Sequence, residues 1–140
     1  MIARVGLFLC GLVFLAPLGC TALNADKDRY EEVSVEGALT ATSLTLPDDG
    51  SRFVPHTVKG RAGETVSIHM QSSDFDAYLL IVNEDEDTVG QNDDCTLGQP
   101  TTDACLNYTF SRDMTLKIIA NAYDAGGLGD YVLTYQRHKP

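Results

Sequence analysis

Short stretches in which apolar and polar residues alternate recur along most of the chain, with glycine, proline and aspartate between them. Alternation with a period of two is typical of strands that bury one face. It predicts strands over 32–36, 42–46, 52–58, 65–71, 77–83, 88–91, 106–110, 115–122 and 130–136. No stretch beyond residue 29 repeats its apolar residues with the 3.6-residue period of a helix. The pattern therefore predicts one all-β domain, an antiparallel β-sandwich of eight or nine short strands.

One of these segments, 77–83, is apolar almost throughout rather than alternating. Continuous apolar sequence is typical of a strand that is covered on both sides. We therefore expect Tyr78 and Leu80, together with Phe75 just before the strand, to lie in the core. In the last segment, every second residue over 131–135 is tyrosine or leucine. This alternation predicts a strand with one buried aromatic face.

The first twenty residues differ from the rest of the chain. Arg4 is their only charge, and an apolar run over 5–16 follows it. A basic start, a short apolar helix and small residues after it are typical of a secretory signal peptide. The run is shorter than the ~20 apolar residues that a membrane-spanning helix needs. We therefore expect a signal peptide over 1–19 that is removed, a polar tether over 20–29 and a folded domain over 30–140.

The residues around Cys20 suggest where the signal peptide is cut. Gly19 followed by Cys20, at the end of the apolar run, resembles a bacterial lipobox, in which the cysteine receives a lipid. This interpretation predicts a lipid anchor on Cys20 and a location in the bacterial cell envelope, on its periplasmic or surface face. An ordinary signal-peptidase cut after Ala22 or Ala25 is the alternative, and it would release a soluble secreted or periplasmic protein.

The cysteines that remain after export form an even pair. Cys10 would leave with the signal peptide and Cys20 would carry the lipid, so Cys95 and Cys105 are left. In an oxidising compartment such a pair predicts a disulfide. Two cysteines ten residues apart, without a second Cys or His pair nearby, do not have the spacing of a zinc site.

The chain is strongly acidic. Lysine and arginine number 10 against 20 aspartates and glutamates, which gives a net charge of −10. A surface of this charge repels phosphate backbones and argues against nucleic acid as a partner. No Lys or Arg lies between Arg61 and Arg112, where ten Asp and Glu residues fall. This interval therefore predicts either a solvated surface or a site that binds a cation.

Four aspartates of that interval fall in pairs just outside predicted strands: Asp74 with Asp76, and Asp93 with Asp94. Two loops at one end of a sandwich would bring the pairs together, and Asn92 would add an amide oxygen. Because Ca²⁺ takes six to eight oxygen ligands from carboxylates, carbonyls and water, the five residues are a candidate calcium site. The alternative is that each aspartate caps its own turn through backbone N–H groups.

Four short motifs lie within the predicted strands and turns: Gly60-Arg-Ala-Gly-Glu-Thr-Val66, Ser73-Asp-Phe-Asp-Ala-Tyr-Leu79, Asn92-Asp-Asp94 and Gly129-Asp-Tyr-Val-Leu133. In this order and spacing, over roughly residues 30–137, they resemble the bacterial pre-peptidase C-terminal domain. The resemblance implies a small, jelly-roll-like β-sandwich of a kind commonly appended to secreted peptidases, although no peptidase domain accompanies the motifs in this sequence. Some members of that family bind calcium or matrix polymers such as collagen.

Together these observations predict a non-catalytic, exported binding or accessory module of the cell envelope, tethered to the membrane and organised by calcium. Its ligand would be a protein or a polysaccharide. A structural envelope lipoprotein without a specific ligand is the alternative. A hydrolase that uses the carboxylates of Asp74 and Asp76 comes third, because the sequence has no nucleophile elbow, zinc-protease motif or phosphate loop. Once the disulfide forms, no thiol nucleophile remains either.

Overall fold

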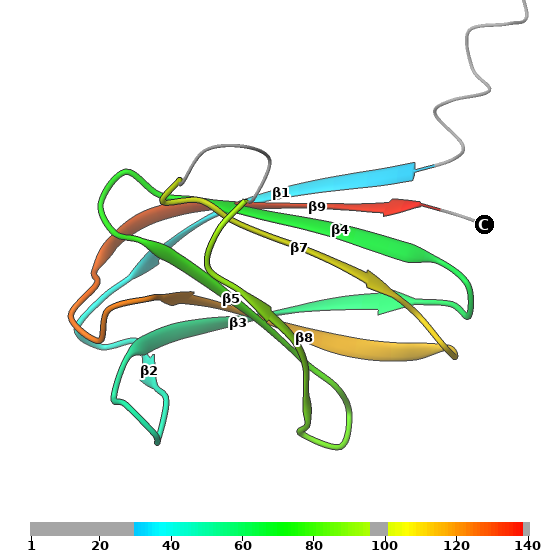
Figure 1. Ribbon diagram of the computed structural model, residues 1–140, viewed down its shortest axis with the longest axis horizontal. Helices are drawn as coiled ribbons and strands as arrows, with labels where there is room; N and C mark the ends of the chain where they lie inside the picture. The colour runs from blue at the N-terminus through cyan, green and yellow to red at the C-terminus, as the bar shows by residue number, and fades with distance from the viewer. Residues whose placement is uncertain (1–29, 96–100, 139–140) are drawn as a thin grey trace, which may run out of the picture.

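The computed structural model describes residues 30–95 and 101–138, which form two packed sheets (Figure 1). Its strands are β1 (Tyr30–Leu39), β2 (Leu44–Thr45), β3 (Arg52–Gly60), β4 (Thr65–Gln71), β5 (Ala77–Val82), β6 (Thr88–Asn92), β7 (Ala104–Thr109), β8 (Met114–Ala122) and β9 (Gly129–His138). The predicted all-β sandwich is confirmed, and each predicted segment overlaps one strand. Within the described ranges, no helix is long and apolar enough to span a membrane. The predicted signal peptide, Cys20 and the tether lie outside the described residues.

The strands form a four-stranded sheet in the order β1-β9-β4-β7 and a five-stranded sheet in the order β2-β3-β8-β5-β6. Every pair of neighbouring strands is antiparallel. Most connections pass from one sheet to the other, so the loops gather at the two ends of the sandwich. One end, at the left of Figure 1, carries the loops 40–51, 72–76 and 123–128, together with residues 93–95 and 101–103.

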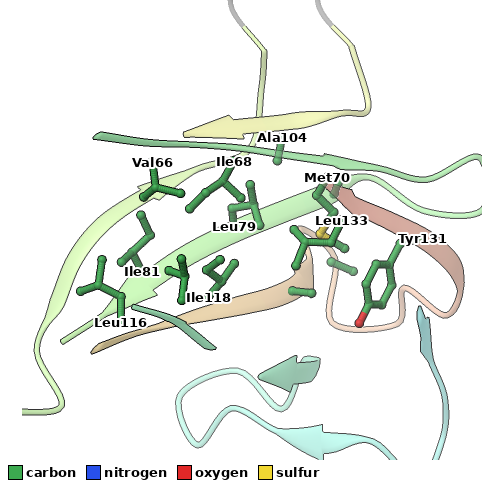
Figure 2. Close-up of a cluster of buried hydrophobic side chains, with 14 of the residues drawn as sticks. Val66, Ile68, Met70, Leu79, Ile81, Ala104, Leu116, Ile118, Tyr131 and Leu133 are labelled. Atoms are coloured by element: carbon green, nitrogen blue, oxygen red, sulfur yellow. The ribbon is translucent and has the colours of Figure 1, made fainter. Parts of the chain in front are cut away.

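The core lies between the two sheets, on the face that the alternating pattern predicts. β4 contributes Val66, Ile68 and Met70, each at most 2% exposed. They meet Leu79 and Ile81 of β5 across the interior (Figure 2). Burial of this many apolar side chains is the main force that holds the sheets together. The last strand also behaves as predicted, because its alternate tyrosines and leucine face the same core.

One polar contact joins the two sheets within this interior. The ring nitrogen Nε2 of His56, on β3, lies 2.8 Å from the hydroxyl of Tyr131, on β9. Burial lowers the pKa of His56 and raises the pKa of Tyr131 to about 12. The tyrosine ring occupies space beside Gly37 on β1, where an added Cβ would fall 2.4 Å from the ring. Glycine at this position therefore lets β1 lie close against the buried tyrosine.

The first of the four sequence motifs forms the turn between β3 and β4. Gly63 has a φ of +85°, a left-handed conformation that favours glycine. Its N–H donates to the Phe110 carbonyl at 2.8 Å, and the Arg61 N–H donates to the Glu64 carboxylate at 2.9 Å. This motif is a structural turn, and it lies at the end of the sandwich away from the candidate calcium ligands.

The structure corrects the expectation for β5. Phe75 is buried as predicted, but Tyr78 and Leu80 point away from the core and are only half-buried. Among the described residues, no element covers the outer side of this strand. Residues on both faces of β5 are apolar, which is why its sequence resembles that of a strand covered on both sides.

Candidate functional site

Loops rich in aspartate gather at one end of the sandwich, which we call the aspartate end (left in Figure 1). Its acidic residues are Asp48, Asp49, Asp74, Asp76, Asp93, Asp94, Asp103 and Asp124. Arg52 is the one lysine or arginine that the described residues place there, and its Nη1 donates to the Ser43 carbonyl at 3.0 Å. The negative charge of this end is therefore largely uncompensated.

The opposite end of the sandwich holds most of the described lysines and arginines. Arg112 lies 3.4 Å from the Glu84 carboxylate, and Lys117 pairs with Glu86. Arg137 pairs with Glu31 near the chain termini. These exposed pairs contribute little to stability individually. Their importance here is that they offset part of the negative charge at this end, so that the charge is more concentrated at the other.

Asp74 closes a loop contact instead of facing the other predicted ligands. Its Oδ2 accepts the N–H of Asp130 at 2.8 Å, from a residue 56 positions further along the chain. Gly129, next to it, has a φ of +137°, and a Cβ built on it would lie 2.3 Å from the Cβ of Asp74. The second and fourth sequence motifs are thus two halves of one contact. Asp74 therefore does accept a backbone N–H, but the N–H belongs to Asp130 at the start of β9 and not to its own turn.

Asp76 is the predicted ligand with the most unusual surroundings. Its Oδ1 is buried and accepts no hydrogen bond within the described part of the chain. Burial raises the pKa of Asp76, and the charges of Asp94, Asp93 and Asp124 raise it further. Three of the five predicted residues therefore act on one another electrostatically, across two loops that the sequence placed at the same end.

Asn92 organises the turn that carries two of these aspartates. Its Oδ1 accepts the N–H of Asp93 at 3.0 Å and the N–H of Asp94 at 3.4 Å. Its Nδ2 donates to the carbonyls of Asp94 and, at 2.7 Å, Cys105. The amide oxygen that the sequence assigned to calcium is thus engaged in holding the loop.

Cys95 and Cys105 form the predicted disulfide, with an S–S distance of 1.96 Å. Cys95 follows β6 in one sheet and Cys105 lies on β7 in the other, so the bridge ties the two sheets together beside the aspartate turn. The Cys95 N–H also donates to the Asp103 carbonyl at 2.9 Å. Because disulfides persist in oxidising compartments, the domain is extracytoplasmic.

The carboxylates at the aspartate end do not converge on one point. Among the described His, Cys, Asp and Glu side chains, the one group close enough to share an ion is His69, Cys95 and Cys105, with ligand atoms within 4.8 Å of one another. Its two sulfurs are bonded to each other, so neither is a thiolate ligand. A Ca²⁺ ion at this end would have to draw the carboxylates of Asp76, Asp93 and Asp94 inward.

Two open hollows border the aspartate end. One, of about 820 Å³, lies over β1, β9 and β4 and is lined by polar residues that include Gln71, Asp103 and Asp130. The other, of about 530 Å³, adjoins the disulfide and is lined by Asn92 and Asp94 among others. Neither Asp74 nor Asp76 lines either of these two hollows.

The sequence does not single out Asp124 of this region, and it points to Tyr123 only as one of three tyrosines, with Tyr78 and Tyr108, that could stack on a sugar or a peptide. Asp124 was not among the candidates, although it follows a predicted strand just as Asp93 does, and this placement was the available signal. Tyr123 packs edge-to-face against Tyr78, with ring centroids 6.3 Å apart, and is 58% exposed. This pair could not be found from spacing, because the two residues belong to different loops and strands. By contrast, Tyr108 packs against the core.

The sequence matches no family model. No curated protein matches it either. Among solved structures, it is similar to the pre-peptidase C-terminal domain of a collagenase from Bacillus anthracis, at 12% identity and a TM-score of 0.52, over 74% of this chain and 88% of that chain. It is also similar to PliG, a periplasmic lysozyme inhibitor of g-type lysozyme from Aeromonas hydrophila, at 13% identity and a TM-score of 0.52, over 80% of this chain and 88% of that chain.

These likenesses define the architecture. The chain has the β-sandwich fold of a pre-peptidase C-terminal domain, as its four motifs predict. The same fold is found in an inhibitor protein. One match is thus a C-terminal domain of a peptidase and the other an inhibitor, and identities of this size establish the shared fold alone.

Proposed function

We propose that this chain is a non-catalytic binding or accessory module of the cell envelope, which binds a positively charged ligand through its aspartate end. A lipid on Cys20 would tether it to the membrane and present the folded domain to a protein or a polysaccharide. Labelling with radioactive palmitate, present in the wild type and absent in Cys20→Ser, is the expected result for such an anchor. The extracytoplasmic disulfide and a fold shared with an inhibitor support this class of function.

The separation of charge along the molecule is the observation that carries the proposal. Three acids of one end are paired with Arg112, Lys117 and Arg137, whereas the loops of the aspartate end have Arg52 alone among the described lysines and arginines. An acidity that served only solubility would need no such separation. A concentrated negative potential attracts cationic partners and raises their rate of association.

Two variants of equal charge test whether position matters. In the first, Asp93→Asn is combined with Asp124→Asn at the aspartate end. In the second, Asp85→Asn is combined with Asp87→Asn in the exposed turn at the other end. With a decalysine peptide as the probe, we expect the first variant to bind about three- to tenfold more weakly than wild type, because each partly exposed charge contributes up to about 1 kcal/mol.

The second variant should bind within about twofold of wild type under the same conditions. Isothermal titration at low and at physiological salt measures both dissociation constants. Equal weakening in the two variants would mean that net charge alone attracts the probe, and the aspartate end would lose its special role. A g-type lysozyme is a natural second probe, since a protein of this fold is described as an inhibitor of that enzyme.

Calcium is the second candidate ligand, and one atom favours it. Asp76 Oδ1 is buried without a hydrogen-bond donor, close to two further carboxylates. A Ca²⁺ ion would satisfy this oxygen and cancel the repulsion, with backbone carbonyls and water completing its shell. Without an ion, the charged form of Asp76 is disfavoured in the folded state.

The variant Asp76→Asn tests whether the Asp76 carboxylate binds calcium. Because the folded pKa of Asp76 is raised, the folded state loses stability as pH rises from the unfolded pKa through the folded one. In EDTA at pH 7 we therefore expect Asp76→Asn to be more stable than wild type, by on the order of 1 kcal/mol. Added calcium should then raise the melting temperature of wild type, by on the order of 10 °C at a hundred times the dissociation constant.

Asp76→Asn should show little of this rise, whereas Asp85→Asn, in the opposite turn, should show all of it. Thermal unfolding of the oxidised full chain across a calcium series gives the answer. If wild type shows no saturable rise, calcium is not a ligand, and the aspartates serve as loop caps and as a charged surface. A structural lipoprotein without any ligand would show neither this rise nor the positional effect on decalysine binding.

A further inference from the structure

The two outer faces of the sandwich differ in chemical character. On the four-stranded sheet, cross-strand neighbours form polar rows, such as Ser34, Thr134 and His69. On the five-stranded sheet, the equivalent central row is Pro55, Ile119 and Leu80. A sandwich exposed to water on both sides is expected to be polar on both outer faces. The outer face of the four-stranded sheet is polar as expected, whereas the outer face of the five-stranded sheet is apolar along its central row.

This apolar outer surface continues toward the aspartate end. Phe53 and Tyr78 lie in the next row, on either side of Asn121, and Tyr123 packs against Tyr78. We call this surface the apolar face and define it by six residues: Phe53, Pro55, Tyr78, Leu80, Ile119 and Tyr123. Leu44, which pairs with Phe53 and is 58% exposed, extends its edge.

The apolar face is not needed to complete the core. The interior is already filled by the inward residues of both sheets, and the apolar face lies on the outer side, where Ile119 is 6% exposed and Phe53, Tyr78 and Leu80 are half-buried. Contiguous apolar surface rimmed by charge commonly marks an interaction site. The exposed Tyr123 strengthens this interpretation, because tyrosines contribute large contact area and are enriched in protein interfaces.

We infer that the apolar face is a docking surface for a protein partner that presents arginine or lysine side chains around an apolar patch. The inference rests on the proposed function in that the partner is taken to be basic, and it adds the surface on which the partner sits. Asp49 and Asp93 lie at the tyrosine edge of this face, close enough that their charges, after burial, raise the pKa of the Tyr78 hydroxyl. A cationic side chain entering there meets both carboxylates and aromatic rings.

Two other occupants fit this surface less well. A second copy of the chain would bring its own acidic rim against the first, and each chain carries a net charge of −10. A polysaccharide stacks best on rings that form a flat platform, whereas Tyr78 and Tyr123 stand at 84° to each other. A single exposed ring face instead suits an arginine side chain, whose planar guanidinium stacks on it.

The test uses matched lysine substitutions at the centres of the two outer faces of the full chain. Leu80→Lys places a charge in the apolar face, and Thr134→Lys places the same charge on the polar face. The probe is a labelled, terminally blocked peptide with two arginines at each end and four apolar residues between them; its control has glutamates in place of the arginines. Fluorescence anisotropy measures binding, and thermal unfolding confirms that both variants fold.

We expect the arginine peptide to bind wild type and Thr134→Lys alike within about twofold, and Leu80→Lys at least tenfold more weakly. Tyr123→Ser, at an exposed position that cannot unfold the domain, should weaken binding about threefold or more. The glutamate peptide should not bind. Equal weakening by the two lysine variants, or equal binding of the two peptides, would overturn the inference.

Two further outcomes would assign the face to another occupant and so also overturn the inference. Sedimentation that shows a wild-type dimer abolished by Leu80→Lys would identify a second copy. Binding of chitotetraose that Tyr123→Ser abolishes would identify a polysaccharide.

The same experiments show which of the two proposals fails. If the arginine peptide binds, and only the Asp93→Asn and Asp124→Asn pair weakens its binding, the proposed function is supported and the docking face is not. If decalysine binding shows no positional effect while Leu80→Lys still weakens binding of the arginine peptide, the docking face is supported and the proposed binding through the aspartate end is not.

Discussion

Gly129→Ala should lower the free energy of unfolding by about 2–4 kcal/mol, which makes it one of the most damaging single-methyl additions in the chain. Gly129 has a φ of +137°, a conformation that costs other residues about 1–3 kcal/mol. Its new Cβ would also fall 2.3 Å from the Cβ of Asp74. The loop would have to shift, and the hydrogen bond from the Asp130 N–H to Asp74 Oδ2 would be lost.

Gly126→Ala is the matched control, because Gly126 lies in the same loop and an added Cβ there meets nothing within 4 Å. This change should alter stability by no more than about 0.5 kcal/mol. Urea or thermal unfolding of the three proteins measures the difference, with a fall of roughly 10 °C expected for Gly129→Ala. If the two glycine variants unfold together, the contact between the second and fourth motifs does not organise this end of the sandwich.

Loss of the disulfide should have a comparable effect. Replacing both Cys95 and Cys105 by serine should cost about 2.5–3 kcal/mol, since the bridge closes a short loop in the unfolded chain. The sequence separation is 10 residues. The bridge also joins the edges of two sheets next to the aspartate turn. We therefore expect amide hydrogen exchange to rise first around Asp93 and Asp94, and much less in β4 at the centre of its sheet.

The same protein under reducing conditions serves as a second measurement. Wild type in excess dithiothreitol should unfold close to the double serine variant, because both lack the same covalent bond. A double variant as stable as oxidised wild type would show that the bridge adds little constraint. Exchange that rises equally throughout the domain would contradict the expected local opening at the aspartate end.

The strands could be predicted from the sequence because most of them bury one face. Val66, Ile68 and Met70 are separated by polar residues, and this alternation alone fixes which side of β4 faces the core. The turn at the start of the Gly60–Val66 motif could likewise be predicted, because it depends on glycines that are close together in the sequence. The disulfide followed from the number of cysteines left after export.

Features that depend on contacts between distant residues could not be predicted. The bond from the Asp130 N–H to Asp74 joins residues 56 positions apart, so local capping was the natural expectation for Asp74. The outward direction of Tyr78 and Leu80 was hidden because β5 is apolar on both faces. The Tyr78 and Tyr123 pair depends on the register between β5 and β8, which no local pattern specifies.

The most direct test of the account is to find where a cationic probe contacts the domain. Amide chemical shifts of the isotopically labelled, oxidised full chain can be followed while decalysine is added at low salt. We expect the largest changes in the loops at 72–76, 93–94 and 123–128, and their loss in the Asp93→Asn and Asp124→Asn pair. Changes centred on the turns at 61–64, 83–87 and 110–113 would contradict the account, as would changes spread evenly over the acidic surface.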